Sequence, residues 1–310
     1  KDLSQTTSEK GDFRFPLLDP GIYEVKVEMQ GFATSTRREV RVSINQTVDL
    51  PFTLELEKFA ATTEVVGTPT VDAEKTQIGT NFTKEVLQNI PSARSVTAVL
   101  NFTPGATDGT VNGASVRGNA LQVDGVDVTD PTVGTQLVTF NFDNIEEIQV
   151  ETGGHKAEYG QLAGSVVNTV TKAGGNAFSG EGNIYFQNQD TTSKNGQKLQ
   201  EFFRLTPGST RKKIDTQGQV GGPIAKDRVW FYGSYGYIDQ DDEVTDFPEI
   251  SNTNQNLAYG KATWQISAKN KLVGSWNYDS RDRNNRGAAK LVPPESTRFQ
   301  KGHGNTENFE

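Results

Sequence analysis

The sequence contains no cysteine, only two histidines and a single methionine. Without cysteine there is no disulfide framework and no thiolate metal site. His155 and His303 stand in no His-Glu-x-x-His pattern, which excludes a zinc peptidase of that type, and no Gly-x-Ser-x-Gly elbow is present. His155 is predicted to be an ordinary surface-loop residue. We therefore expect no enzyme activity, no cofactor and no metal site.

Basic residues are outnumbered, and the formal net charge is −8. Nucleic-acid binding depends on clustered lysine and arginine, so no nucleic-acid partner is expected. No apolar run approaches the roughly 20 residues that a membrane helix needs. No charged-then-apolar leader stands at Lys1, which predicts a mature or trimmed chain. The strands of a β-barrel would escape this hydropathy test, because their residues alternate.

What the sequence has is glycine (31 residues), valine, threonine and asparagine, a composition that favours strands and turns. Residues 1–57 carry three strand-like runs, "GIYEVKVEMQGF", "REVRVSI" and "QTVDLPFTLEL". The first alternates with the period of a half-buried strand and follows the turn signal "LDPG". This zone is predicted to be a small β-sandwich. Residues 58–70, "KFAATTEVVGTPT", are predicted to be a linker.

Residues 71–176 have a mixed pattern. "TKEVLQNIPSARSVTAVLN" places apolar residues at helical spacing but is interrupted by Pro91. Short strand-like runs follow, "ASVRG", "LQVDGVDV", "IEEIQVET" and "SVVNTVTK". This zone is predicted to be an α+β domain with many glycine turns.

From residue 177 onward the chain reads as strands and loops. "PIAKDR" and "SAKNK" are short polar turns, whereas the alternate connections, about 188–212 and 239–254, are long and hydrophilic. Short turns alternating with long loops, together with aromatic clusters, are typical of an outer-membrane barrel. We predict that 177–310 holds about five strands of roughly 10 residues each.

Two charged groups in this zone have alternative interpretations. An acidic cluster could bind Ca²⁺ or simply form a solvated loop; it comprises Asp239, Asp241, Asp242 and Glu243. A basic set could face lipopolysaccharide or simply be strand-end charges; it comprises "RKK" at 211–213, Arg281, Arg283 and Arg286.

Four stretches, in order, resemble the TonB-dependent outer-membrane transporters, and most closely their Oar-like branch. "FPLLDPGIYEVKVEMQGF" is similar to a carboxypeptidase-regulatory-like domain. "ASVRGNALQVDGVDVTDP" and "IEEIQVETGGHKAEYGQLAGSVVNTVTKAGGNAFSG" resemble two segments of the family's plug domain. "GGPIAKDRVWFYGSY" resembles the first periplasmic hairpin of the barrel.

The resemblance implies a mainly β fold in four parts. These are a carboxypeptidase-regulatory-like β-sandwich (1–57), a linker with a candidate TonB box (58–70), an α+β plug domain (71–176) and the first strands of a transmembrane antiparallel β-barrel (177–310). A family barrel has about 22 strands, and an open sheet cannot persist in lipid. We therefore expect the chain to be part of a longer polypeptide.

The resemblance also implies partners. TonB, acting with ExbB and ExbD in the periplasm, would pair with a short extended segment before the plug. The best candidate is "TTEVVG", 62–67, centred on Glu64, Val65 and Val66, because an exposed strand is suited to β-augmentation. The alternative is that this segment is the last strand of the N-terminal domain.

Within the plug, Arg117 resembles the family arginine that forms an ion pair with the barrel wall, and a buried guanidinium needs such a partner. The segment "TDPTVGT" resembles an apical, substrate-facing loop, and an ordinary hairpin loop is the alternative. Its candidate residues are Thr129, Asp130, Thr132 and Thr135.

Three functions remain open at this point. The resemblance favours a TonB-dependent receptor or transporter in the bacterial outer membrane, with its N-terminal domain in the periplasm and its barrel in contact with lipid and lipopolysaccharide. The first alternative is a structural or adhesion protein with the same barrel and plug but no active transport. The second is a secreted β-protein that binds carbohydrate.

Overall fold

The computed structural model describes residues 3–16, 18–44, 47–56, 64–66, 78–107, 109–160, 162–191, 209–244, 246–267, 270–289 and 292–309. The chain divides into two compact units. One consists of Lys1–Ser4, Leu137–Asn144 and Lys172–Glu310, and the other of Gln5–Gln136 and Ile145–Thr171. We call the first the strand unit and describe each unit by itself.

The N-terminal part of the second unit is a three-stranded sheet in the order β1-β2-β3 (β1, Gly21–Val27; β2, Ser35–Val42; β3, Glu64–Val66). Burial alternates along β1, as the period-two pattern predicts. β1 and β2 are antiparallel, and β3 adds to β2 in parallel. The predicted strand in 47–56 is not present. Residues 47–56 contribute a single isolated β-bridge, between Phe32 and Leu56, and no strand.

The rest of the second unit is built on a five-stranded sheet in the order β4-β9-β10-β7-β8. Its strands are β4 (Ile78–Thr83), β7 (Ala120–Val123), β8 (Val126–Asp127), β9 (Ile145–Gly153) and β10 (Val166–Thr171). A small hairpin, β5 (Ala106–Thr107) with β6 (Thr110–Val111), stands apart from it. The 3₁₀ turns are η2 (Val116–Gly118) and η4 (Ala157–Tyr159).

Two short helices, α1 (Lys84–Asn89) and α2 (Val96–Leu100), lie where the helical spacing predicted them. Pro91 keeps them apart, because proline cannot continue a helix. The Ser95 hydroxyl caps α2 by accepting a hydrogen bond from the backbone N–H of Ala98 at 3.2 Å.

Strand β10 is the centre of this sheet. It pairs in parallel with β7 and antiparallel with β9, and all six of its residues are buried. Burial on both faces explains why the strand is β-branched almost throughout, with Val166, Val167 and Val170 in the core. Its polar residues therefore need partners inside the protein, and these are described below.

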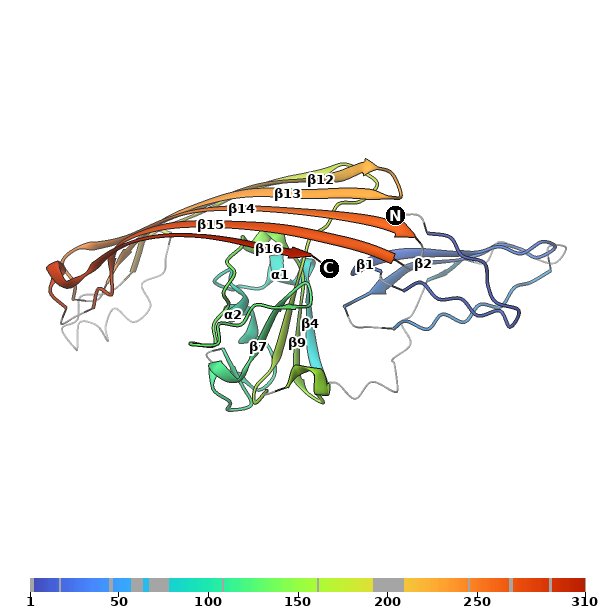
Figure 1. Cartoon of the computed structure of the whole chain (residues 1–310), viewed down its shortest axis with the longest axis horizontal. Helices are drawn as coiled ribbons and strands as arrows, with labels where there is room; N and C mark the ends of the chain where they lie inside the picture. The colour runs from blue at the N-terminus through green and yellow to red at the C-terminus, as the bar shows by residue number, and fades with distance from the viewer. Residues whose placement is uncertain are drawn as a thin grey trace. The chain divides into compact units, whose positions relative to one another are not determined.

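The strand unit contains a six-stranded antiparallel sheet in chain order, whose long strands run side by side (Figure 1). The strands are β11 (Ser179–Asn188), β12 (Ser209–Ala225), β13 (Val229–Glu243), β14 (Ile250–Ser267), β15 (Asn270–Arg286) and β16 (Arg298–Phe309). The short 3₁₀ turns η3 (Phe142–Asn144) and η5 (Pro294–Ser296) belong to the same unit.

Two sequence predictions about this sheet are corrected. The sheet has six strands rather than about five, because β16 ("RFQKGHGNTENF") carries almost no apolar alternation and was not recognisable. The predicted long loop 239–254 is mostly strand, since β13 continues to Glu243 and β14 begins at Ile250. Strand pairing holds these polar residues extended, which hydropathy alone does not indicate.

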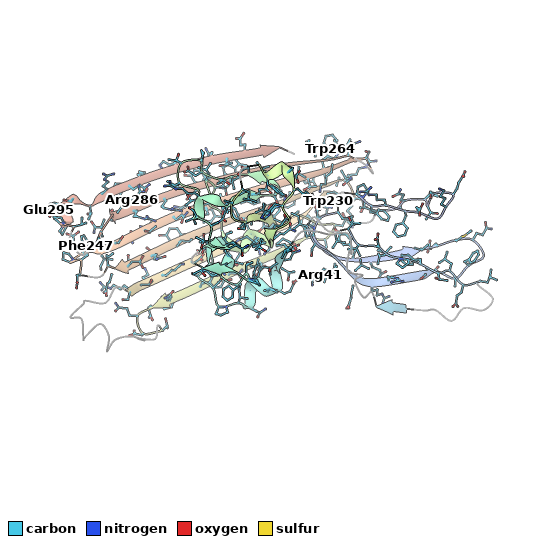
Figure 2. All side chains as sticks on the ribbon, turned by 90° about the horizontal axis from the view of Figure 1, so that it is seen from below. Arg41, Trp230, Phe247, Trp264, Arg286 and Glu295 are labelled. Atoms are coloured by element: carbon cyan, nitrogen blue, oxygen red, sulfur yellow. The ribbon has the colours of Figure 1, made fainter. Side chains whose placement is uncertain are left out.

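The two faces of the sheet differ sharply. One carries exposed apolar side chains, including Ile184 (78% exposed), Phe186, Tyr235, Trp264 and Trp276. The other face carries buried side chains, many of them polar, among them Asp215, Gln217, Gln255 and Asn277. Trp230 and Trp264 lie at one end of the sheet, and Phe247, Arg286 and Glu295 at the other (Figure 2). No helix within the described ranges is long and apolar enough to span a bilayer.

Candidate functional site

The Val-Asp-Gly-Val motif forms the tight turn between β7 and β8. Asp124 and Gly125 both have positive φ (50° and 85°), which is the signature of a two-residue hairpin of the Asp-Gly type. The Asp124 carboxylate accepts hydrogen bonds from the Thr171 backbone N–H (2.9 Å) and hydroxyl (2.6 Å), and Asn168 accepts one from the Gly125 N–H. The motif therefore fixes the C-terminal end of β10.

A second clamp holds the N-terminal end of β10. The buried Asn119 side chain donates to the Gly109 carbonyl and accepts from the N–H and hydroxyl of Ser165, at 3.0 and 3.1 Å. A Cβ at Gly164 would overlap the Asn119 amide oxygen, so glycine is required there for close approach. Both ends of β10 are thus fixed by side chains from loops distant in sequence.

The loop 129–136 contains the four predicted substrate-facing residues. Thr129 is used to anchor the loop, because its hydroxyl oxygen accepts from the Leu121 N–H at 2.8 Å. Asp130 shapes the turn: its carboxylate accepts from the N–H groups of Thr132 (2.7 Å) and Val133 (3.2 Å). The hydrogen bond from the Thr132 N–H, followed by that from Val133, lowers the pKa of Asp130. Thr132 and Thr135 are exposed, so these two have free surface for a ligand.

Arg117 lies in η2 and is exposed. Within the described ranges it forms no ion pair, so the predicted pairing with a barrel wall stays a prediction. Its backbone lies against Gly134, where a Cβ would overlap the Arg117 Cα. Arg117 therefore helps to seat the loop that carries the substrate-facing candidates.

The strand unit contains a non-strand segment bound to the polar face of its sheet. We call this segment, Leu137–Asn144, the docked segment. The Asn277 side chain donates to the Thr139 carbonyl at 2.9 Å, and the Tyr185 hydroxyl donates to the Asp143 carboxylate at 3.2 Å. Gly236 leaves room for Asn141, because a Cβ there would lie 2.7 Å from the Asn141 amide nitrogen. Three separate strands thus hold the segment.

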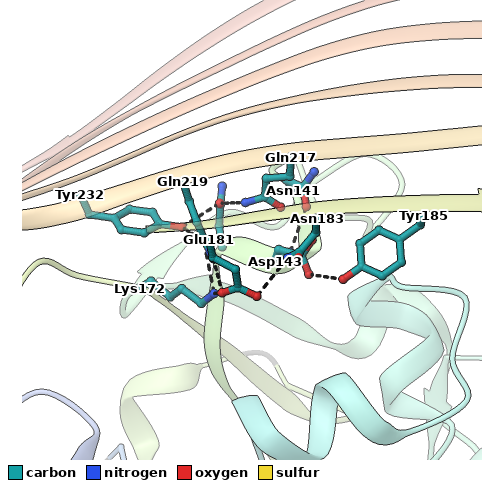
Figure 3. A network of polar contacts seen from close by, with 10 residues as sticks. Asn141, Asp143, Lys172, Glu181, Asn183, Tyr185, Gln217, Gln219 and Tyr232 are labelled. Atoms are coloured by element: carbon teal, nitrogen blue, oxygen red, sulfur yellow. Dashed lines mark hydrogen bonds and ion pairs between the residues drawn. The ribbon is translucent and has the colours of Figure 1, made fainter. Parts of the chain in front are cut away.

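A buried polar cluster lies where the docked segment ends (Figure 3). The Asn144 amide oxygen accepts from Gln217 at 2.7 Å and from the Tyr232 hydroxyl at 3.0 Å. The Lys172 backbone N–H donates to the Asn144 carbonyl at 2.8 Å, which joins the two chain positions that flank β9 and β10. We call the group formed by Asn144, Lys172, Glu181, Gln217, Gln219 and Tyr232 the seam cluster.

Lys172 carries the only positive charge of the seam cluster. Its side chain is 9% exposed, and its ammonium lies 3.5 Å from the Glu181 carboxylate and 3.2 Å from the Gln219 amide oxygen. Gln219 also donates to Glu181 at 2.5 Å, and its amide oxygen lies 2.5 Å from the Tyr232 hydroxyl, whose single proton is shared between Gln219 and Asn144. A buried ammonium with an ion partner and an amide acceptor is satisfied, so the cluster is suited to holding chain segments rather than to acid–base chemistry.

The glycines after Lys172 also have a structural role. A Cβ at Gly174 would overlap the Phe231 carbonyl oxygen, whereas Gly175 has open space. The next residue, Asn176, accepts hydrogen bonds from the Trp230 indole N–H (2.7 Å) and the Asp227 backbone N–H (3.0 Å). The segment 172–176 is therefore attached closely to β12 and β13, which leads the chain into β11.

The structure shows where several residues of the predicted acidic cluster and basic set lie in the strand unit. Asp239, Asp241, Asp242 and Glu243 are strand residues of β13 rather than a solvated loop. Lys212 forms an ion pair with Asp239 at 2.8 Å. Arg281 donates to the Thr139 hydroxyl at 3.4 Å, so it faces the docked segment. In the part of the chain that the structure describes, no group of three or more acidic or histidine side chains could hold a metal ion.

The candidate TonB segment, Glu64–Val66, is β3 of the N-terminal sheet. Its residues pair with Thr36, Arg37 and Arg38 of β2. This pairing is that of the alternative considered above, in which the segment is the last strand of the N-terminal domain. Whether the segment binds TonB stays a prediction.

The sequence did not reveal the docked segment or the seam cluster. A signal for Lys172 existed, since a lysine follows directly on a buried β-branched strand and precedes two glycines. For Asn144 no such signal existed, because an asparagine before a strand is most often an ordinary turn residue.

Comparison with known families agrees with this architecture. Residues 2–55 match the carboxypeptidase regulatory-like domain, and residues 61–167 match the TonB-dependent receptor plug domain. The TonB-dependent transporter Oar of Myxococcus xanthus is 28% identical over 263 residues, with 74% of this chain covered. The chain spans only 23% of that relative's length.

Solved receptors share the fold. The siderophore receptor PirA from Acinetobacter baumannii gives a TM-score of 0.54 at 18% identity, covering 70% of this chain and 33% of its own. A mutant ferric enterobactin receptor (PfeA) from Pseudomonas aeruginosa, in complex with enterobactin, gives 0.56 at 14% identity, covering 74% and 38%. The chain therefore carries a carboxypeptidase regulatory-like domain, a TonB-dependent receptor plug domain and a long antiparallel sheet, and it is similar to the TonB-dependent transporter Oar across most of its length.

Proposed function

We propose that the protein is a TonB-dependent outer-membrane transporter that moves a substrate through a plugged β-barrel at the expense of the proton-motive force. One observation carries the proposal: a single chain combines the plug-domain match at 61–167 with a long antiparallel sheet that is apolar on one face and polar on the other. A barrel wall needs such two-sided strands, because one face meets lipid and the other the lumen.

The proposal assigns roles to the predicted residues. Glu64, Val65 and Val66 bind TonB, which acts with ExbB and ExbD, and Arg117 faces the barrel wall. Thr132 and Thr135 keep exposed side chains that contact substrate. The apolar face of β11–β16 contacts outer-membrane lipid and lipopolysaccharide, and the N-terminal domain lies in the periplasm. Because the matching domain and relative are those of receptors and transporters, we propose no enzyme activity.

The test uses the absence of cysteine from these 310 residues, so that a single introduced cysteine is the one labelling site within them. Ser165 is fully buried at the end of β10. In cells that express the protein with Ser165→Cys, a membrane-permeant maleimide should react only when the plug is remodelled. We expect labelling to fall severalfold when a protonophore is added or when the cells lack TonB.

The control variant is Thr132→Cys, because Thr132 is already exposed and its labelling should not depend on energy. If Ser165→Cys were labelled at the same rate with and without the proton-motive force, active transport would be rejected. The structural or adhesion function would then be preferred, since it keeps the barrel and plug without energised movement.

A further inference from the structure

The inference concerns β3, the strand Glu64–Val66, and rests on the proposed TonB dependence. The plug-domain match begins at residue 61, so sequence comparison assigns this strand to the plug. The structure instead pairs it with β2 of the N-terminal sheet. One short segment is thus shared between a family signature and a neighbouring domain.

Strand β3 is an edge strand. The sheet order is β1-β2-β3, and among the described strands none pairs with the far side of β3. An edge strand presents a row of free backbone N–H and C=O groups, which is a template for one more strand. The N-terminal domain therefore holds the segment in the extended conformation that β-augmentation requires.

Pairing with β2 also bears on the energetics of binding. Fixing the backbone of a residue in an extended conformation costs conformational entropy, and three residues are fixed in β3 before any partner arrives. A partner strand that adds to an ordered edge does not have to meet that cost again.

We propose that the N-terminal domain is part of the TonB docking surface: β2 presents β3 as a preformed edge strand, and an extended strand of TonB adds to its free side. The partner would extend the three-stranded sheet to four strands. This assigns the carboxypeptidase-regulatory-like domain a role in recruitment. The opposite possibility is that β2 hides the segment and must release it before TonB binds.

A disulfide lock separates the two. Thr36 and Glu64 are register partners, and the cysteine-free chain makes the cross-link in Thr36→Cys/Glu64→Cys unambiguous. Neighbouring-strand partners lie within the Cα separation that a disulfide accepts. A matched control is Val27→Cys/Ser35→Cys, which locks β1 to β2 without touching β3.

The full chain in detergent micelles is titrated with the purified periplasmic domain of TonB, oxidised and then reduced. We expect the oxidised Thr36→Cys/Glu64→Cys variant to bind as tightly as the reduced form or up to about tenfold more tightly. Loss of binding on oxidation, restored by reduction and absent from the control pair, would overturn the inference and show that β2 hides the strand. If the unmodified chain did not bind TonB, the proposed function itself would fail, and this inference with it.

Discussion

Removing the charge of Lys172 should destabilise the seam cluster and lower the free energy of unfolding. Breaking one side of a fully buried ion pair costs about 3–5 kcal/mol. Glu181 is 32% exposed and keeps two other donors, Gln219 at 2.5 Å and Asn183 at 3.1 Å. The residual penalty on Glu181 is therefore smaller. We expect Lys172→Met to lower the free energy of unfolding by about 2 kcal/mol.

The assay is urea unfolding of the chain in detergent micelles, followed by tryptophan fluorescence, since Trp230 lies on the strand that carries Tyr232. A double-mutant cycle with Glu181→Gln isolates the pair, and its coupling energy should be about 1–2 kcal/mol. Lys172→Arg, which keeps the charge, should recover part of the loss. A coupling energy indistinguishable from zero would refute the argument that Lys172 and Glu181 stabilise the seam together.

Two further predictions concern single residues of the strand unit and the plug. Gly174→Ala should lower the thermal unfolding temperature or prevent folding, because the added Cβ would overlap the Phe231 carbonyl oxygen. Gly175→Ala is the control and should leave the unfolding temperature unchanged, because a Cβ there meets open space. Equal effects of the two substitutions would contradict the close packing at Gly174. Because the pKa of Asp130 is depressed, its charged form adds stability above the ordinary aspartate pKa of about 3.9, and that stability is lost as the pH falls through the lower folded-state value. Asp130→Asn should therefore be less stable than the wild type at neutral pH, and the difference in unfolding free energy should shrink as the pH falls below about 3.9. A difference in unfolding free energy that stays the same from neutral to acid pH would contradict this role of the carboxylate.

Much of the architecture followed from sequence, because it depends on local patterns. Period-two alternation located β1, and helical spacing interrupted by Pro91 located α1 and α2. The Val-Asp-Gly-Val motif was found as a family feature, and the structure adds its physical reason in the clamp on Thr171. The sixth strand of the sheet was not predicted, because β16 is polar and contains glycine, and it is a strand through its pairing with β15.

The candidate site could be predicted less well. Thr129 and Asp130 were expected to face substrate, yet their oxygens hold the loop together, which leaves Thr132 and Thr135 exposed. The expected ion pair between Arg117 and the barrel wall stays a prediction, whereas the buried Lys172 was not singled out from the sequence. Which polar side chain finds which partner depends on contacts across 40 or more positions in sequence, as for Asn144 and Gln217.

By itself the sequence determined the order of the domains, the strand-rich class and the glycine-rich stretches on either side of β10, the second of which is the junction to β11, because alternation, turn residues and backbone freedom are local properties. Only the tertiary structure decided why those glycines are needed and what holds the junction. Gly164 admits the Asn119 side chain, Gly174 admits the Phe231 carbonyl, and Lys172 is satisfied by groups from β11 and β12. Close approach and burial are properties of the assembled sheet, and no local pattern contains them.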